Sequence, residues 1–399
     1  MTEDIGVAVI GAGMAGRAHA HGYRSAGTVF SAGLPLVRLV SVADINEELA
    51  ADTAHRYGFE RSDSSWQAIV KADDIDVVSV VVANHLHREI VEALAAAGKH
   101  VLCEKPLAPT SADAQAMIEV VDAAGVVGRV GFTFRRTPGI AAARELITSG
   151  ELGRPLYVNA QYWTDYGSDP QAPMSWRYRG GPGSGALADL GSHLADTAEF
   201  LLGPVESVTG AALTTVIGER PKPLGHVVGH AHVEVSDERE PVENDDWASF
   251  SVRFAGGATG DLSVSRIAFG HPNTLKFEVF CERGALAFDV SRAGEFQIAQ
   301  DAPGFRRVVV GVDHPYVAGG LAMDATGIGT GHNDSFVYQA RAFLDEVTGR
   351  DELPRNASFT DGKHALLLEE AVIQTAAQNT PTPCHRLTTT TPQDSNVEV

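Results

Sequence analysis

The sequence predicts an α/β protein with two units. The first is a doubly wound parallel sheet, and the second is an α+β unit with a large, mostly antiparallel open sheet. Three observations support this prediction. Apolar strands alternate with helical patterns up to about residue 134, a glycine-rich turn directly follows the first strand, and strands with two-residue periodicity dominate afterwards. We expect domains at 1–134 and 135–380, followed by a flexible tail at 381–399.

In the first unit, strands are expected at 5–10, 36–43, 75–83, 100–103 and 126–134. Helices are expected from the glycine turn to about residue 26, and at 47–57, 89–97 and 111–124. The segment 75–83 is nearly continuous valine, as is typical of a strand that is covered on both faces. This βαβ alternation favours a parallel sheet.

The second unit begins with a helix at 140–149, and two closing helices are expected at 336–348 and 364–378. Its expected strands are 156–163, 205–215, 247–254, 259–267, 276–281 and 285–290. Residues 218–246 are rich in Pro, Gly, His and Asp and predict an excursion loop. Because an open antiparallel sheet leaves one face to be covered, we expect a homo-oligomer, a dimer or tetramer, that forms through this sheet.

The composition excludes several classes of partner. The 399 residues include 51 acidic and 31 basic side chains, which give a formal net charge of −20. Such a surface repels phosphate, so nucleic acid and anionic membranes are not expected partners. The acidic start at 1–4 differs from a signal peptide, and the longest apolar stretch, 77–83, is too short to span a membrane. Three cysteines without metal or redox spacing predict reduced thiols and a cytoplasmic location.

The turn Gly11-Ala12-Gly13-Met14-Ala15-Gly16 matches the dinucleotide-binding fingerprint of a Rossmann domain. Gly11 makes the tight turn, Gly13 lets the backbone approach a pyrophosphate, and Gly16 allows close packing of helix and strand. The phosphates would rest on the helix N-terminus, beside Met14 and Ala15. The alternative is an ordinary tight turn.

Asp44 ends the second strand, where a carboxylate accepts hydrogen bonds from the adenosine ribose and repels a 2′-phosphate. No arginine follows it, so the sequence favours NAD over NADP as the cofactor. Asn84 follows the third strand, on the path of the cofactor backbone. His87 is a further cofactor-binding candidate, although capping of the next helix is an equally good interpretation.

Lys105 follows the fourth strand, between Glu104 and Pro106. Taken alone it could be a surface lysine in a loop. However, it falls at the same edge of the sheet as the glycine turn, Asp44 and Asn84, where open α/β folds bind ligands. We therefore assign Glu104 and Lys105 to the cofactor side of the site, and Lys105 also to the catalytic group.

The second unit supplies Asp189 and His193, which are four residues apart and share one face of a predicted helix. Burial of an acid and an imidazole costs free energy unless both find partners, which favours a catalytic site. The alternatives are a capping Asp with a satisfied histidine, or a metal pair. Since no third ligand is evident, no metal is expected.

Four further residues are substrate-binding candidates: Arg135, Trp176, Arg177 and His332. An aromatic ring beside a guanidinium suits the face and hydroxyls of a sugar, although Arg135 could instead brace the domain junction. The cluster of His226, His230 and His232 has no neighbouring cysteine, and a solvated loop is expected there.

Together these motifs resemble the Gfo/Idh/MocA oxidoreductase family. The matching residues are Gly11-x-Gly13-x-x-Gly16, Glu104-Lys105-Pro106 and Gly185-Ala186-Leu187-x-Asp189-x-Gly191-x-His193. A narrower resemblance, to the levoglucosan, sugar and inositol dehydrogenases, rests on Arg135-Arg136-Thr137-Pro138, Ser175-Trp176-Arg177-Tyr178, Gly183-Ser184-Gly185-Ala186-Leu187, Glu219-Arg220-Pro221 and His314-Pro315-Tyr316. One departure is Val82-Ala83-Asn84, where the family more often has Thr-Pro-Asn.

The resemblance implies that Lys105, Asp189 and His193 are the catalytic group of an NAD-dependent dehydrogenase. Its expected substrate is a secondary alcohol of a sugar, an anhydrosugar or a cyclic polyol such as inositol. In this hypothesis His193 is the general base, Lys105 polarises the oxygen, and Asp189 orients the substrate and steadies His193. Two other classes stay open: an NAD-assisted glycoside-processing enzyme and a non-catalytic NAD(P)-binding sensor.

Overall fold

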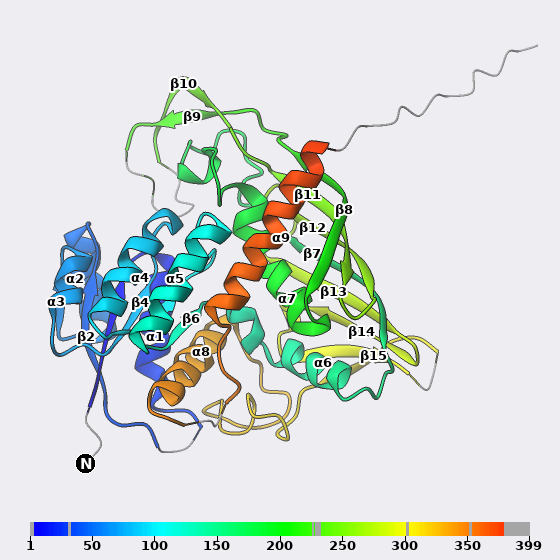
Figure 1. The fold of residues 1–399 in the computed structure, drawn as a ribbon, viewed down its shortest axis with the longest axis horizontal. Coiled ribbons are helices and arrows are strands. Elements are labelled where there is room, and N and C mark those ends of the chain that lie inside the picture. The colour runs from blue at the N-terminus through cyan, green and yellow to red at the C-terminus, as the bar shows by residue number, and fades with distance from the viewer. Residues whose placement is uncertain are drawn as a thin grey trace, which may run out of the picture.

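The N-terminal unit is a six-stranded parallel sheet with helices on both faces (Figure 1). The computed structural model describes residues 4–30, 33–225, 227, 233–300, 303–350 and 353–378. The strand order β3-β2-β1-β4-β5-β6 confirms the predicted doubly wound sheet. Its strands are β1 (Ile5–Ile10), β2 (Val37–Ala43), β3 (Arg61–Asp63), β4 (Val77–Val80), β5 (His100–Cys103) and β6 (Gly128–Val130).

The helices of this unit follow the predicted alternation. They are α1 (Met14–Ala26), α2 (Glu47–Tyr57), α3 (Trp66–Lys71), η1 (Asn84–Leu86), α4 (His87–Ala96) and α5 (Ser111–Ala124). Thr110 caps α5 by accepting a hydrogen bond from the Asp113 amide. The short β3 and α3 were not predicted, because three to six residues carry too little periodicity to be recognised.

The last predicted strand of the unit, 126–134, is much shorter in the structure. Only β6 pairs with β5, and the chain then turns into the 3₁₀ helix η2 (Thr133–Arg136). The amides of Phe132 and Thr133 bond back to the carbonyls of Val130 and Gly131, which ends the extended backbone. This turn directs Phe132 and Phe134 into the core.

The second unit contains an eight-stranded sheet with the order β16-β15-β14-β13-β7-β12-β11-β8. Only β7 and β12 run parallel, so the predicted mostly antiparallel sheet is confirmed. Its strands are β7 (Pro155–Trp163), β8 (Val205–Thr214), β11 (Trp247–Phe254), β12 (Thr259–Ser265), β13 (Thr274–Cys281), β14 (Gly284–Asp289), β15 (Glu295–Ala299) and β16 (Arg306–Val309).

Helices cover one face of this sheet (Figure 1). They are α6 (Pro138–Thr148), α7 (Ser192–Leu202) and α9 (Phe359–Gln378). Three short helical turns complete the unit, namely η3 (Trp176–Tyr178), the π-helical η4 (Leu187–Gly191) and η5 (Val290–Arg292). On β7, Val158, Ala160 and Tyr162 are buried beneath the helices, whereas Tyr157, Asn159, Gln161 and Trp163 alternate with them on the open face.

The expected excursion loop at 218–246 contains regular structure instead. The strands β9 (Glu219–Pro223) and β10 (Val235–Pro241) pair antiparallel in a separate two-stranded sheet, which projects at the top of Figure 1. Strand β9 contains two prolines, a residue that is unfavourable in strands, so the sequence did not predict a strand there. His226, His230 and His232 lie outside the described residues, as does the predicted tail at 381–399.

The helix α8 (His332–Val347) returns to the N-terminal unit and packs along α1. The contact is close, because a Cβ added at Gly22 of α1 would lie 2.7 Å from the carbonyl oxygen of Phe336. Helix α9 then crosses between α5 and β8 (Figure 1). This packing brings His332, the first residue of α8, near Phe134 of η2, with 5.1 Å between their ring centroids.

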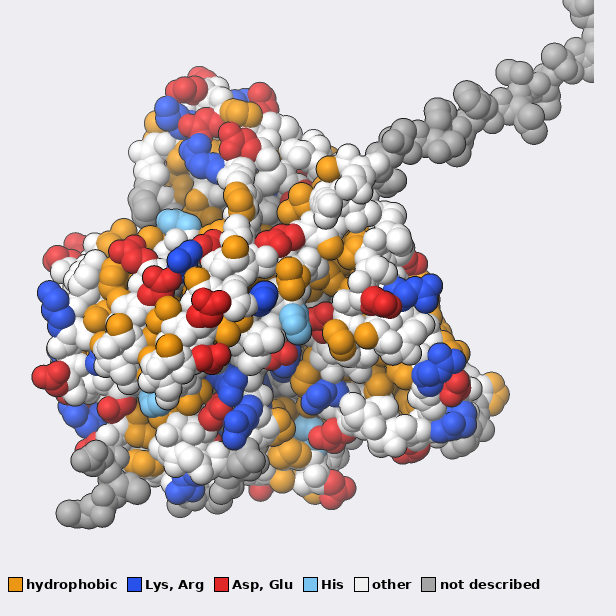
Figure 2. All heavy atoms as spheres, viewed as in Figure 1, with side chains coloured by type: hydrophobic (Ala, Val, Ile, Leu, Met, Phe, Trp, Pro, Cys, Tyr) orange, Lys and Arg blue, Asp and Glu red, His pale blue; other side chains and the backbone are white. Residues whose placement is uncertain are grey.

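Acidic and basic side chains are interspersed over the face of the molecule that Figure 2 shows. In the part of the chain that the structure describes, none of the helices has the length and apolar character needed to cross a membrane.

Candidate active site

The glycine turn has the geometry that a dinucleotide requires. Gly11 has φ of +103°, which favours glycine, and a Cβ on Gly16 would lie 1.8 Å from the Gly11 carbonyl oxygen. By contrast, a Cβ on Gly13 would meet open space. Helix α1 begins directly afterwards with no side-chain cap and no acidic residue in its first turn. Its first amides are therefore able to receive a pyrophosphate beside Met14 and Ala15, so the turn fits NAD.

Asp44 fastens this turn to the end of β2. Its Oδ2 accepts a hydrogen bond from the Ala12 amide at 2.8 Å, and its Oδ1 accepts one from the Asn46 amide at 2.9 Å. A carboxylate has about four acceptor positions, so two amides leave capacity for ribose hydroxyls. Asn84 contacts the second unit, because its Nδ2 donates to the Gly183 carbonyl at 3.0 Å.

His87 differs from the prediction that it lines the cofactor site. The side chain is buried, and its two ring nitrogens lie 3.1 Å from the Leu107 carbonyl oxygen and 3.0 Å from that of Val82. Burial lowers the pKa of the imidazole. His87 therefore joins two loops beneath the site and presents no ring nitrogen to a cofactor.

Glu104 is also enclosed, which corrects its assignment as a cofactor contact. Its Oε1 lies 2.9 Å from Nε2 of His19, and its Oε2 accepts from the Lys105 amide at 3.1 Å. Burial raises the pKa of Glu104, but the hydrogen bond from His19 and the charge of Lys105 outweigh it, so the net pKa is lowered. His19 in turn contacts Ser79, which also bonds to Tyr23. This network holds the backbone of Lys105 in place.

Lys105 of the first unit and Asp189 of the second are in direct contact. The Lys105 Nζ lies 3.0 Å from Oδ1 of Asp189 and donates to its backbone oxygen at 2.8 Å. The remaining carboxylate oxygen, Oδ2, accepts from the hydroxyl of Tyr166 at 2.9 Å. Burial raises the pKa of Asp189, but the charges of Lys105 and Arg177 and these hydrogen bonds outweigh it. Asp189 is consequently an anion that holds Lys105.

His193 is the second residue of α7, and its ring is surrounded by aromatic rings. Its ring centroid lies 4.9 Å from that of Phe134, 6.0 Å from Tyr162 and 6.1 Å from Phe132. Burial and the charge of Lys105 hold the pKa of His193 well below its usual value. Its Nδ1 is buried and finds no hydrogen-bond partner among the described residues. This neutral imidazole is able to accept a proton.

The expectation that Asp189 steadies His193 needs correction. Within the described ranges, no hydrogen bond joins the two side chains, and the carboxylate oxygens of Asp189 bond to Lys105 and Tyr166 instead. The reason is local. Asp189 lies in the π-helical turn η4 and not in the α-helix that the four-residue spacing predicted.

Trp176 and Arg177, two further predicted site residues, belong to the short helix η3. Trp176 is 52% exposed, and the guanidinium carbon of Arg177 lies 4.5 Å from the centre of its indole ring. The charge of Arg177 helps to lower the pKa of Asp189, so the two side chains lie within electrostatic range of each other. His332 lies at the start of α8, with its ring 5.1 Å from Phe134, which also contacts His193.

Arg135 has a structural role, in contrast to the prediction that it binds substrate. It makes hydrogen bonds of 2.5–3.0 Å to both carboxylate oxygens of the buried Asp196, and its Nη2 lies 3.2 Å from Asp361. Its guanidinium also covers the ring of Phe200. These contacts brace η2 against α7 and α9.

Sequence reasoning missed Tyr166 and His19. Each acts through a partner far along the chain, since Tyr166 and Asp189 are 23 positions apart and His19 and Glu104 are 85 apart. Neither lies in a motif. The only available signal for His19 was a polar side chain on the otherwise buried face of α1.

Two family models match the chain. One, described as an oxidoreductase family with an NAD-binding Rossmann fold, covers residues 5–132, and the GFO/IDH/MocA C-terminal domain covers residues 140–287. The chain belongs to the Gfo/Idh/MocA oxidoreductase family. The expected NAD-binding Rossmann domain of an oxidoreductase is thereby confirmed.

Similar proteins within this family act on sugars and polyols. Levoglucosan dehydrogenase of Pseudarthrobacter phenanthrenivorans is 37% identical over 94% of this chain and 97% of its own length. A structure of levoglucosan dehydrogenase in complex with NADH and levoglucosan has a TM-score of 0.85 and 36% identity, and covers 94% of this chain and 98% of its own. The scyllo-inositol 2-dehydrogenase (NAD(+)) of Bacillus subtilis is 28% identical over 72% of this chain and 74% of its own length.

Proposed function

We propose that this protein is an NAD-dependent dehydrogenase that oxidises a secondary hydroxyl of an anhydrosugar such as levoglucosan to a ketone. The observation that carries the proposal is the contact of Lys105 with the Asp189 carboxylate beside a neutral His193 that has a partnerless ring nitrogen. The similarity to levoglucosan dehydrogenase over nearly the whole length of both chains supports the substrate class.

In this proposal His193 accepts the proton of the substrate hydroxyl. Lys105 donates a hydrogen bond to the same oxygen and stabilises the negative charge that develops there. Asp189 orients Lys105, and the stacked pair Trp176 and Arg177 binds the ring and hydroxyls of the sugar. Bound NAD⁺ supplies the hydride acceptor. A positioned general base contributes about 10²–10⁴-fold to such a reaction.

Inositol oxidation is the second candidate, since inositol dehydrogenases are among the similar proteins at 25–28% identity. A cyclic polyol presents the same secondary hydroxyls to the same three catalytic side chains. A panel of levoglucosan, common sugars and inositols, with NADH formation as the readout, separates the two candidates. If levoglucosan reacts with the highest kcat/KM the first proposal holds, whereas a preference for an inositol replaces it.

We further propose that a second copy of the chain covers the open face of the large sheet. Two aromatic pairs lie on this face, Trp163 with Trp247 at 5.4 Å and Tyr157 with Phe280 at 6.3 Å between ring centroids. A polar hollow of about 260 Å³, lined by Gln161, Lys276 and Glu278 among others, lies between them and the sheet edge. A face that combines aromatic anchors with polar groups is typical of a homo-oligomer interface.

The free, buried thiols of Cys103 and Cys281 support a cytoplasmic location.

A further inference from the structure

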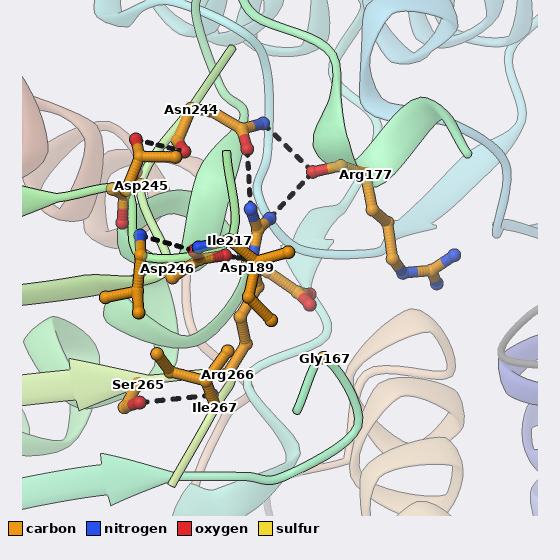
Figure 3. Close-up of polar contacts among 12 residues, drawn as sticks. Gly167, Arg177, Asp189, Ile217, Asn244, Asp245, Asp246, Ser265, Arg266 and Ile267 are labelled. Atoms are coloured by element: carbon orange, nitrogen blue, oxygen red, sulfur yellow. Dashed lines mark hydrogen bonds and ion pairs between the residues drawn. The ribbon is translucent and has the colours of Figure 1, made fainter. Parts of the chain in front are cut away.

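Three consecutive residues outside the catalytic group, Asn244, Asp245 and Asp246, lie near the backbone of Arg177 (Figure 3). They fall between β10 and β11. Asp246 forms a fully buried ion pair with Arg266, the residue directly after β12. Oδ1 of Asp246 lies 2.8 Å from Nε of Arg266. Burial of two charges costs free energy that a single pair barely recovers, so the further contacts of Arg266 matter.

Those contacts fix the loop that carries Arg177. Nη1 of Arg266 donates to the Arg177 carbonyl at 2.9 Å, and Nη2 donates to Oδ1 of Asn244 at 2.8 Å. The amide Nδ2 of Asn244 donates to the carbonyls of both Arg177 and Arg179, each at 2.9 Å. Figure 3 shows the backbone of Arg177 held from this side, while its side chain extends away from Arg266 and Asn244.

Arg266 also supports the neighbouring ring and the Tyr166 loop. The ring of Tyr178 lies between two guanidinium groups, with Arg220 at 3.9 Å and Arg266 at 4.5 Å from its centre. The backbone oxygen of Arg266 accepts from the Gly167 amide at 2.8 Å, one residue after the Tyr166 that bonds to Asp189. The loop that carries Arg177 is thus held through its backbone groups.

Asp245 fastens a different element, the π-helical turn η4. Its Oδ2 accepts from the Leu187 amide at 2.8 Å, and its backbone oxygen accepts from the Ala186 amide at 3.0 Å. These bonds hold the first residues of the turn that carries Asp189. The approach is close, since a Cβ on Gly185, whose φ is +88°, would lie 2.0 Å from Oδ1 of Asp245.

We propose that Asn244 and Asp245 are positioning residues with different roles. Asn244 sets the affinity for the sugar by holding the backbone of Arg177, and Asp245 sets the turnover by holding the turn that carries Asp189. Adjacent residues thereby control different kinetic constants. This inference rests on the proposed dehydrogenase function.

The test compares Asn244→Ala and Asp245→Ala in the full-length protein, since loss of Arg266 or Asp246 would leave a buried charge unpaired and endanger folding. Asn244→Ala removes the two hydrogen bonds that Asn244 donates and the one that it accepts from Arg266, and we expect KM for levoglucosan to rise about tenfold with kcat nearly unchanged. For Asp245→Ala we expect kcat to fall about tenfold with KM nearly unchanged. The KM for NAD⁺ should stay the same in both variants.

Conservative variants separate positioning from general damage. Asp245→Asn keeps an acceptor oxygen for the Leu187 amide and should restore most of kcat, whereas Asn244→Asp loses both N–H donors and should behave like Asn244→Ala. Asp52→Ala, in an exposed ion pair on α2, is the matched control and should change neither constant. Parallel changes of kcat and KM in the two alanine variants, or no rescue by Asp245→Asn, would overturn the inference.

Hydrogen exchange provides a readout that does not depend on turnover. Asn244→Ala should speed exchange at the amides of 177–179, and Asp245→Ala at those of 186–189, each by about tenfold or more. If the wild type oxidises no sugar but exchange changes locally as stated, the proposed function fails while the positioning holds. If sugars are oxidised but exchange speeds up throughout the second unit in both variants, the positioning fails and the function stands.

Discussion

Lys105 and Asp189 come from different units and are 84 positions apart, yet the ammonium of Lys105 contacts both the carboxylate and the backbone oxygen of Asp189. The contact joins the carboxyl edge of the parallel sheet to the π-helical turn before α7. His193 makes no hydrogen bond to Asp189 within the described residues, and burial and the charge of Lys105 hold the pKa of its imidazole well below the usual value. In the proposed mechanism, Lys105 polarises the substrate oxygen and the neutral His193 accepts the proton.

This division predicts the acidic limb of the pH profile. The base must be neutral to accept a proton, and burial and Lys105 lower the pKa of His193, so protonation inactivates the enzyme only below the usual histidine value. The log of kcat/KM should therefore stay level down to below pH ~6.5 and then fall. Lys105→Met removes a positive charge and should raise the pKa of the His193 imidazole in an NMR titration, with His193→Gln identifying the signal. An acidic limb of kcat/KM with its midpoint above the usual histidine pKa would argue against His193 as the base. An unchanged or lowered pKa of His193 in Lys105→Met would argue against it as well.

Asp44 should control cofactor choice. Asp44→Ser removes a charge that would repel a 2′-phosphate and two bonds that anchor the turn after β1 and the start of α2. We expect KM for NAD⁺ to rise about 10–100-fold, while NADP⁺ is used relatively better. Steady-state kinetics with both cofactors measures this. An unchanged ratio between the two cofactors would show that Asp44 only anchors the turn.

Arg135 should matter for stability and little for substrate binding. Arg135→Met leaves Asp196, whose side chain is 2% exposed, buried without its cation, and should lower the free energy of unfolding by about 3–5 kcal/mol. Urea denaturation measures the loss, and Arg56→Met, in an exposed pair with Asp52, is the control with little expected effect. A large rise in KM for the sugar without loss of stability would restore the original prediction that Arg135 binds substrate.

The open face of the large sheet should carry the subunit contact. Light scattering should give a mass of two or four chains for the wild type. Phe280→Asp places a charge at an aromatic anchor that is 39% exposed in the single chain, and should shift the mass toward one chain. Ile373→Asp, at a similarly exposed apolar residue on α9, should leave the mass unchanged. A monomeric wild type would contradict the proposal.

The sequence predicted the parts of the site that lie in local patterns. The turn from Gly11 to Gly16 and the strand-end Lys105 could be found because their chemistry depends on immediate neighbours and on one sheet edge. The structural role of Arg135 could not be predicted, because its partner Asp196 is 61 residues away. The sequence alone does not distinguish an arginine in a buried ion pair from one that binds substrate. The spacing of Asp189 and His193 was found, but a π-helical turn has no sequence signature that distinguishes it from an α-helix.

The most direct test of the proposed function is the formation of NADH by the purified protein with NAD⁺ and levoglucosan. We expect NADH and a keto sugar in equal amounts, and a loss of at least about 10²-fold in kcat for both Lys105→Ala and His193→Ala, which should still bind NADH. Absence of NADH with levoglucosan and with every other sugar and inositol tested, in a folded protein that binds NADH, would contradict the account. Near wild-type turnover in both variants would contradict it equally.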